Sequence, residues 1–262
     1  MSTYDAVAPV FDRHRALPEG VPRAIRTAVL AAIGAPARPR LIDIGAGTGR
    51  IGFAFAAAGD DYVGVDSSFG MLRAFLERPE IAGRPPLLAQ SDGELLPFRD
   101  ATFDAAMLIQ IFGGLRGWRR VVAEARRVLR PTGALVLGRT AAPVDGVDAR
   151  MKQRLASILE DMGVASDRTN VREDVQHWLD SSAKGSAGVV AAAWSAERTP
   201  RAFLERHRTG AGFSTLPEAI KDEALRELGA FAAATFGSLD AVLREPHTFE
   251  LKLYRFHQGT GR

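Results

Sequence analysis

The stretch Leu41-Ile42-Asp43-Ile44-Gly45-Ala46-Gly47-Thr48-Gly49 decides how the rest of this chain is interpreted. Apolar residues around Asp43 predict a buried strand over residues 40–44, and the alternating glycines predict a tight loop after it. An apolar segment at residues 50–58 then predicts a helix whose N-terminal amides point toward the loop. Because glycine has no Cβ, the backbone of this loop can approach a ligand closely, so we expect a binding site here.

Strands and helices are expected to alternate after the loop. Strands are predicted at residues 62–65, 87–89, 103–112 and 134–137, helices at 67–76 and 118–129, and a turn at 131–133. This alternation implies right-handed βαβ units and a parallel sheet covered on both faces. Residues 149–162, 171–179 and 217–236 are predicted as helices, and residues 189–194 and 249–256 as strands that complete the sheet.

Composition excludes several classes of protein. The 262 residues are 46% hydrophobic and 25% charged, as in an ordinary globular protein. The absence of cysteine excludes disulfide frameworks, cysteine-based zinc sites and thiol catalysis. No apolar run approaches the ~20 residues that span a bilayer, and the first twenty residues lack a secretory pattern, so we expect a cytoplasmic protein without membrane insertion. The formal net charge of +3 is too small to require a polyanionic partner.

Two further acids strengthen the expected site. Asp66 closes the second predicted strand 21 positions after Gly45, where a carboxylate can accept hydrogen bonds from both hydroxyls of a ribose. Asp92 follows the third predicted strand. A dinucleotide-binding loop would need glycine where Arg50 stands, so the spacing departs from that motif.

Together these segments resemble the class I S-adenosylmethionine-dependent methyltransferases. The resemblance covers residues 4–138 and rests on the glycine loop, Val65-Asp66-Ser67-Ser68 with Met71-Leu72, Ser91-Asp92-Gly93 with Leu96-Pro97-Phe98, Phe103-Asp104, and Glu124 with Arg127-Val128-Leu129-Arg130-Pro131. It implies a Rossmann-like α/β fold, with a seven-stranded, mostly parallel sheet and helices on both faces. We expect a single domain: an N-terminal helical cover at residues 1–34, a cofactor-binding core at 35–142, and sheet completion with inserted substrate-pocket helices at 143–262.

The resemblance also implies roles toward the methyl donor S-adenosyl-L-methionine, whose product is S-adenosyl-L-homocysteine. Asp43 and the loop backbone would hold the methionine part, Asp66 the ribose, and Met71 with Asp92 the adenine. The implied cofactor-binding residues are Tyr4, Asp43, Gly45, Ala46, Gly47, Gly49, Asp66, Ser67, Met71, Asp92, Gly93 and Gln110. Alternatives stay open, since Met71 can equally be plain core, Asp92 can cap a turn, and Gln110 can be a satisfied polar group at a strand end. We expect no metal.

The expected reaction is in-line transfer of the methyl group to a small-molecule acceptor, apolar or aromatic, at oxygen, nitrogen or carbon. A quinone-type carbon methyltransferase falls within this class. His14 and Gln110 are the catalytic candidates, because His14 lies on the predicted cover and Gln110 at the end of the fourth predicted strand. The missing cysteine excludes the cysteine-dependent members of the family.

Two alternative functions remain at this point. The helix predicted at residues 118–129 is rich in arginine, so an RNA methyltransferase could use it, although a solvated helix face explains the same residues. The arginines in and beside this helix are Arg116, Arg119, Arg120, Arg126, Arg127 and Arg130. The second alternative is a non-catalytic S-adenosylmethionine-binding protein. The sequence favours a small molecule over nucleic acid and leaves the acceptor, the general base and the oligomeric state open.

Overall fold

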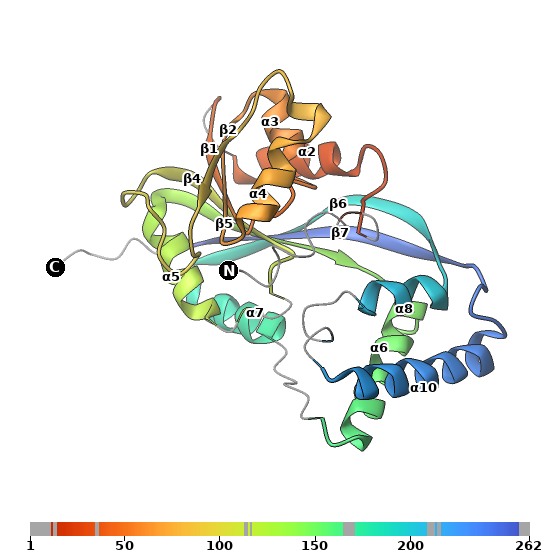
Figure 1. Ribbon diagram of the computed structural model, residues 1–262. Coiled ribbons are helices and arrows are strands. Elements are labelled where there is room, and N and C mark those ends of the chain that lie inside the picture. Colours follow the sequence, from red (N-terminus) through yellow and green to blue (C-terminus); the bar gives the residue numbers. More distant parts are fainter. Residues whose placement is uncertain are drawn as a thin grey trace. The chain divides into compact units, whose positions relative to one another are not determined.

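The computed structural model describes residues 12, 15–34, 37–112, 115, 117–164, 171–208, 213 and 216–256. Within them, seven strands form one sheet in the order β3-β2-β1-β4-β5-β7-β6 (Figure 1). The strands are β1 (Arg40–Ile44), β2 (Asp61–Asp66), β3 (Leu87–Gln90), β4 (Phe103–Ile109), β5 (Leu129–Ala141), β6 (Gly185–Arg198) and β7 (Leu243–Arg255). From β3 through β2, β1 and β4 to β5 the strands pair in parallel, and β7 is antiparallel. The predicted seven-stranded, mostly parallel sheet is confirmed.

The central strands are buried because their apolar residues face helices on both sides of the sheet. Every residue of β4 is buried, and so are four of the five residues of β1. Asp104 is the acid within β4, and its carboxylate accepts hydrogen bonds from the Arg130 guanidinium (2.7 Å) and the Arg40 amide (2.8 Å). These partners offset the cost of burying a charge inside the sheet.

Helices cover both faces of the sheet, with α2, α3 and α4 on one side and α5 and α7 on the other (Figure 1). Ser68 caps α4, since its hydroxyl accepts a hydrogen bond from the Met71 amide (3.2 Å). No helix of the described residues is long and apolar enough to cross a membrane. The described helices are α2 (Val21–Ile33), α3 (Phe53–Ala58), α4 (Phe69–Leu76), the 3-10 turn η2 (Pro79–Ile81), α5 (Trp118–Val128), α6 (Val147–Asp161), α7 (Val171–Ser182), α8 (Pro200–Arg208) and α10 (Glu218–Phe236).

The chain forms two compact units. The first comprises Met1–Thr140, Asn170–Ala192 and Phe249–Arg262, and its core packs apolar residues of α5 and α7, such as Val122 and Val175, against the sheet. The second comprises Ala141–Thr169 and Ala193–Thr248. Its own core joins α6, α8 and α10 through residues that include Met151, Phe203 and Leu228. The division into one domain with the boundaries given above stays a prediction.

Three predicted elements of the cofactor-binding core differ from the structure, and β6 and β7 are each longer than the strands predicted at residues 189–194 and 249–256. The turn predicted at residues 131–133 is wrong, because these residues lie inside β5, where a register shift opposite Phe103 and Ala105 accommodates the extra length. The fourth strand ends at Ile109 rather than at residue 112, since Gln110 has a left-handed φ of 58° that breaks the extended chain. The helix predicted from residue 50 begins at Phe53.

Candidate active site

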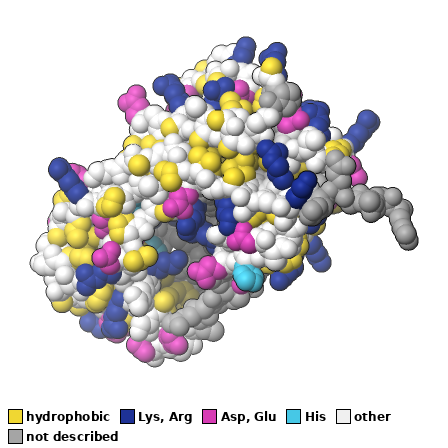
Figure 2. All heavy atoms as spheres, turned by 180° about the vertical axis from the view of Figure 1, so that it is seen from behind, with side chains coloured by type: hydrophobic (Ala, Val, Ile, Leu, Met, Phe, Trp, Pro, Cys, Tyr) yellow, Lys and Arg dark blue, Asp and Glu magenta, His cyan; other side chains and the backbone are white. Residues whose placement is uncertain are grey.

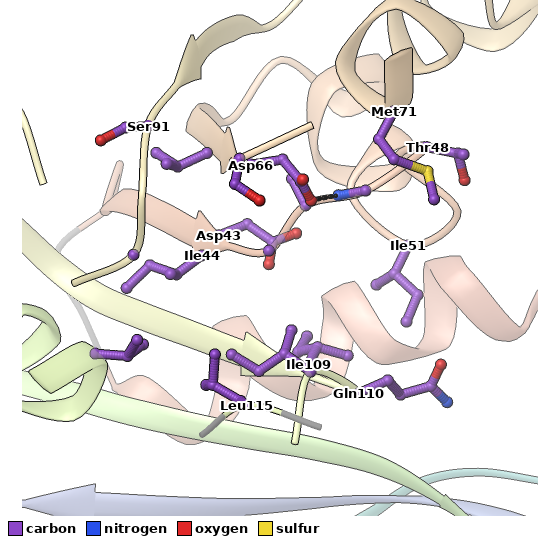
Figure 3. Close-up of a pocket in the computed structure, with 18 of the residues that line it drawn as sticks. Asp43, Ile44, Thr48, Ile51, Asp66, Met71, Ser91, Ile109, Gln110 and Leu115 are labelled. Atoms are coloured by element: carbon purple, nitrogen blue, oxygen red, sulfur yellow. Dashed lines mark hydrogen bonds between the residues drawn. The ribbon is translucent and has the colours of Figure 1, made fainter. Parts of the chain in front are cut away.

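A cavity of about 280 Å³ lies at the carboxyl ends of β1, β2 and β4, within the first unit (Figure 3). This is the edge at which ligands bind in open parallel sheets. In Figure 3 the carboxylates of Asp43 and Asp66 point into the same space from neighbouring strands. The described residues that line the cavity are Asp43, Ile44, Gly45, Ala46, Gly47, Thr48, Arg50, Ile51, Val65, Asp66, Ser67, Met71, Ser91, Asp92, Gly93, Ile109, Gln110, Ile111, Leu115 and Val121.

Most residues predicted to bind the cofactor are brought together around this cavity. Gly49 does not line it, because the loop turns this position toward α4. Tyr4 and the catalytic candidate His14 lie outside the described residues. The predicted residues that line the cavity are Asp43, Gly45, Ala46, Gly47, Asp66, Ser67, Met71, Asp92, Gly93 and Gln110. Their individual roles toward the cofactor stay predictions.

The acid at the end of β2 is held in place by the backbone. One carboxylate oxygen of Asp66 accepts a hydrogen bond from the Gly47 amide (2.9 Å), and the other from the Ser68 amide (2.8 Å). A carboxylate oxygen has two lone pairs and can accept more than one hydrogen bond. The cavity thus presents an oriented carboxylate, which we predict accepts hydrogen bonds from the ribose of the cofactor.

The acid within β1 has a different environment. Asp43 is buried, with 4% of its surface exposed, and its carboxylate accepts a hydrogen bond from the Tyr62 hydroxyl (2.7 Å). Burial raises the pKa of Asp43 to about 7, and the negative charge of Asp66 adds to this, although the Tyr62 hydrogen bond lowers it. A buried carboxylate gains most from a nearby positive charge. S-adenosylmethionine carries positive charge on its sulfonium and ammonium groups, which fits this position.

The raised pKa of Asp43 predicts a pH-dependent stability. The folded chain holds this proton more tightly than the unfolded chain, whose Asp titrates near 3.8, so the free energy of unfolding falls as the pH rises from about 4 to about 7. As the pH rises across this window, we expect the free energy of unfolding of Asp43→Asn to increase relative to that of wild type by between about 1 and about 4 kcal/mol. Above this window we expect the difference between the two proteins to stay constant. Urea denaturation of both proteins at several pH values measures this difference, and a gap that stays constant with pH would contradict the assignment.

Arg50 lines the cavity but was not among the predicted site residues. Its guanidinium donates hydrogen bonds to the side-chain oxygen of Gln110 and to the carbonyl of Arg15. The amide nitrogen of Gln110 in turn donates to the Thr140 hydroxyl (2.7 Å). Burial lowers the pKa of Arg50 to about 10, so it is still a cation near neutral pH. The signal in the sequence for a role of Arg50 at the site is its position directly after the glycine loop. From the sequence alone, Arg50 is interpreted only as a departure from the dinucleotide motif.

Asp12, in the N-terminal part of the chain, contacts the glycine loop. Its carboxylate accepts a hydrogen bond from the Thr48 hydroxyl (2.6 Å) and forms an ion pair with Arg78 (2.6 Å). Arg78 also donates to the carbonyl of Thr48 (2.8 Å). A residue of the predicted helical cover therefore contacts the loop that borders the cavity.

Met71 and Asp92 also line the cavity. Met71 is almost fully buried, so it serves as core of α4 while it also lines the cavity. One carboxylate oxygen of Asp92 accepts a hydrogen bond from the Glu94 amide (2.9 Å), so the turn-capping alternative is real. Its other oxygen remains available to a ligand, and the two interpretations of Asp92 are compatible.

Comparison with known proteins identifies the family. A model described as "Methyltransferase domain" matches residues 42–137. The demethylmenaquinone methyltransferase of Mycobacterium sp. (strain KMS) is 34% identical over 232 residues, which are 84% of this chain and 93% of that protein. The chain belongs to the class I S-adenosylmethionine-dependent methyltransferases. The demethylmenaquinone methyltransferase of Renibacterium salmoninarum is 36% identical over 148 residues, 55% of this methyltransferase chain and only 59% of the length of that relative.

Solved structures agree on the fold. The YcgJ protein from Bacillus subtilis superimposes with a TM-score of 0.55 at 20% identity, over 87% of this methyltransferase and 97% of that chain. Identity this low supports the fold alone. The predicted methyltransferase family, the α/β fold and S-adenosylmethionine as the methyl donor are confirmed. The two relatives are named for a small molecule, demethylmenaquinone.

Proposed function

We propose that this methyltransferase transfers the methyl group of S-adenosylmethionine to a ring carbon of a small aromatic acceptor of the quinol type. The observation that carries the proposal is a single cavity with two chemically different walls. Carboxylates from β1 and β2 form one wall, and Ile109, Ile111 and Leu115 form an apolar wall near the end of β4 (Figure 3). An aromatic ring gains free energy by burial against such apolar residues. The Mycobacterium relative, named for a quinone precursor, supports the same acceptor class.

The described residues would hold the donor and the acceptor in line. Bound S-adenosylmethionine supplies a methyl group on a positively charged sulfur, so the carbon is already activated. Asp66 and Asp43 would fix the ribose and methionine parts of the donor at the acid wall. Gln110 would position the acceptor, because Arg50 and Thr140 hold its side chain from both ends. Alignment of this kind can supply several kcal/mol of the barrier reduction.

A proton must leave the acceptor carbon after the methyl group is attached. An amide cannot take this proton, so Gln110 acts by position and not as a base. His14 remains our candidate for the base. It follows Asp12, whose carboxylate accepts a hydrogen bond from the Thr48 hydroxyl, by two positions in the sequence. His14 itself lies outside the described residues.

The contacts of the arginines in and beside α5 favour a small-molecule acceptor over RNA. Arg127 forms ion pairs with Glu124 and Asp100 (both 2.7 Å), and other arginines of this region have partners of their own. Arg120 pairs with Glu94, Arg130 pairs with Asp104, Arg119 lies over the Trp118 ring and Arg126 over the Phe256 ring. On the face shown in Figure 2, basic and acidic side chains are interspersed, whereas RNA binding needs gathered positive charge.

A transfer assay tests the proposal. The purified protein is incubated with methyl-labelled S-adenosylmethionine and reduced 1,4-naphthoquinone, with or without a prenyl chain, and in parallel with bacterial tRNA. We expect label on the naphthoquinol ring and none on tRNA. Label on tRNA would favour the RNA alternative. Binding of S-adenosylhomocysteine without any transfer would favour a non-catalytic protein.

A further inference from the structure

A second cavity, of about 240 Å³, lies in the first unit and shares no residue with the cofactor cavity. It lies between α7 and the strands β5, β6 and β7, and Phe112, Leu137, Val189 and Leu251 give it apolar walls. Its size suits a molecule of one or two rings, since drug-sized ligand pockets begin at about 300 Å³.

Residues that line the two cavities are neighbours at two places. Phe112 of the second cavity directly follows Ile111 of the first. The amide of Gln110, which lines the first cavity, donates a hydrogen bond to the carbonyl of Gly138, which lines the second (2.9 Å). A ligand in the second cavity would therefore lie close to Gln110, the residue that we place beside the acceptor.

The charges around the second cavity leave one cation unpaired. Arg139 forms an ion pair with Glu250 (2.7 Å), and Lys252 forms one with Asp180 (2.6 Å). Arg172, in the first turn of α7, has no ion pair or hydrogen bond with any other described residue. Its pKa is lowered by partial burial and then by the positive charge of Arg139. Arg172 is exposed, so its guanidinium is open to an anionic ligand, and a guanidinium–carboxylate pair is stronger than a hydrogen bond between neutral groups.

We propose that this second cavity binds a small apolar carboxylate. The carboxylate would pair with Arg172, whose planar guanidinium offers two parallel N–H donors to two oxygens. The apolar body would lie against Phe112, Leu137 and Val189. The site is independent of the proposed methyl transfer, because none of these residues lines the cofactor cavity.

Calorimetric titration with a matched pair of probes tests this site. 2-Naphthoate and 2-naphthamide share the same ring system and differ mainly in charge. We expect wild type to bind the acid at least about tenfold more tightly than the amide, and Arg172→Gln to abolish this preference. Arg73→Gln removes the same charge from an exposed position on α4 and should leave the preference for the acid over the amide as in wild type.

S-adenosylhomocysteine is titrated into the same proteins to separate the outcomes. Arg172→Gln should bind it as wild type does, which shows that the variant is folded. Equal binding of the acid and the amide by wild type would overturn the second site, and so would an unchanged preference in Arg172→Gln. Failure of wild type to bind S-adenosylhomocysteine would count against the proposed function. The titration with naphthoate would still test the second cavity independently.

Discussion

Asp66→Ala is expected to weaken the binding of S-adenosylhomocysteine at least about 100-fold while the protein stays folded. The substitution removes the carboxylate that we expect to accept hydrogen bonds from two ribose hydroxyls, and hydrogen bonds to a charged group contribute about 1.5–3 kcal/mol each. Two such bonds correspond to roughly 10²–10⁴ in affinity. The loss also frees the Gly47 amide, which Asp66 now holds at 2.9 Å, so the glycine loop loses part of its orientation.

Asp61→Ala is the matched control, because Asp61 lies at the other end of the same strand. Its side chain is 54% exposed, and its nearest cation, Arg40, is 3.7 Å away. We expect calorimetric titration to give this variant the affinity of wild type. The ribose assignment would be wrong if Asp66→Ala stayed within about threefold of wild type, or if both variants lost affinity alike.

The central sheet could be predicted because its signals are local. Residues 40–44 form β1 as predicted, since apolar residues around Asp43 followed by glycines allow few other structures. The strand predicted at residues 134–137 lies within β5, but the first residues of β5 were missed. Pro131 and Gly133 carry a turn signal there, although the chain pairs with β4 on either side of them, at Leu129 and Ala134. Strand pairing is a tertiary interaction, and it routinely outweighs local propensity.

The candidate site was predictable to a similar extent. Asp43, Asp66 and Asp92 follow or close strands in sequence, and parallel strands bring such ends to one edge of the sheet. The contact between Arg50 and Gln110 joins residues 60 positions apart, and nothing in either local pattern indicates it. The sequence also could not distinguish Gly47 from Gly49, although the structure assigns them different tasks.

Gly49→Ala is expected to destabilise the protein by about 2–5 kcal/mol, roughly twice as much as Gly47→Ala. Both glycines have left-handed φ angles, 72° and 57°, and an alanine there costs about 1–2 kcal/mol. At Gly49 the added Cβ would lie 2.1 Å from a ring carbon of Phe75, which is fully buried and cannot move aside. Overpacking of this kind adds about 1–3 kcal/mol. At Gly47 the nearest atom would be 4.0 Å away, so only the backbone cost applies.

Urea denaturation and calorimetric titration together separate the two glycines. Gly47 lines the cofactor cavity, so we expect Gly47→Ala to lose affinity for the donor and to lose only the backbone cost of about 1–2 kcal/mol in stability. Gly49→Ala should show the reverse order, with the larger effect on the free energy of unfolding. Phe75→Leu should recover part of the loss when it is combined with Gly49→Ala, because a smaller side chain relieves the contact. Equal destabilisation by the two alanines would mean that the loop does not pack on α4 as the structure shows.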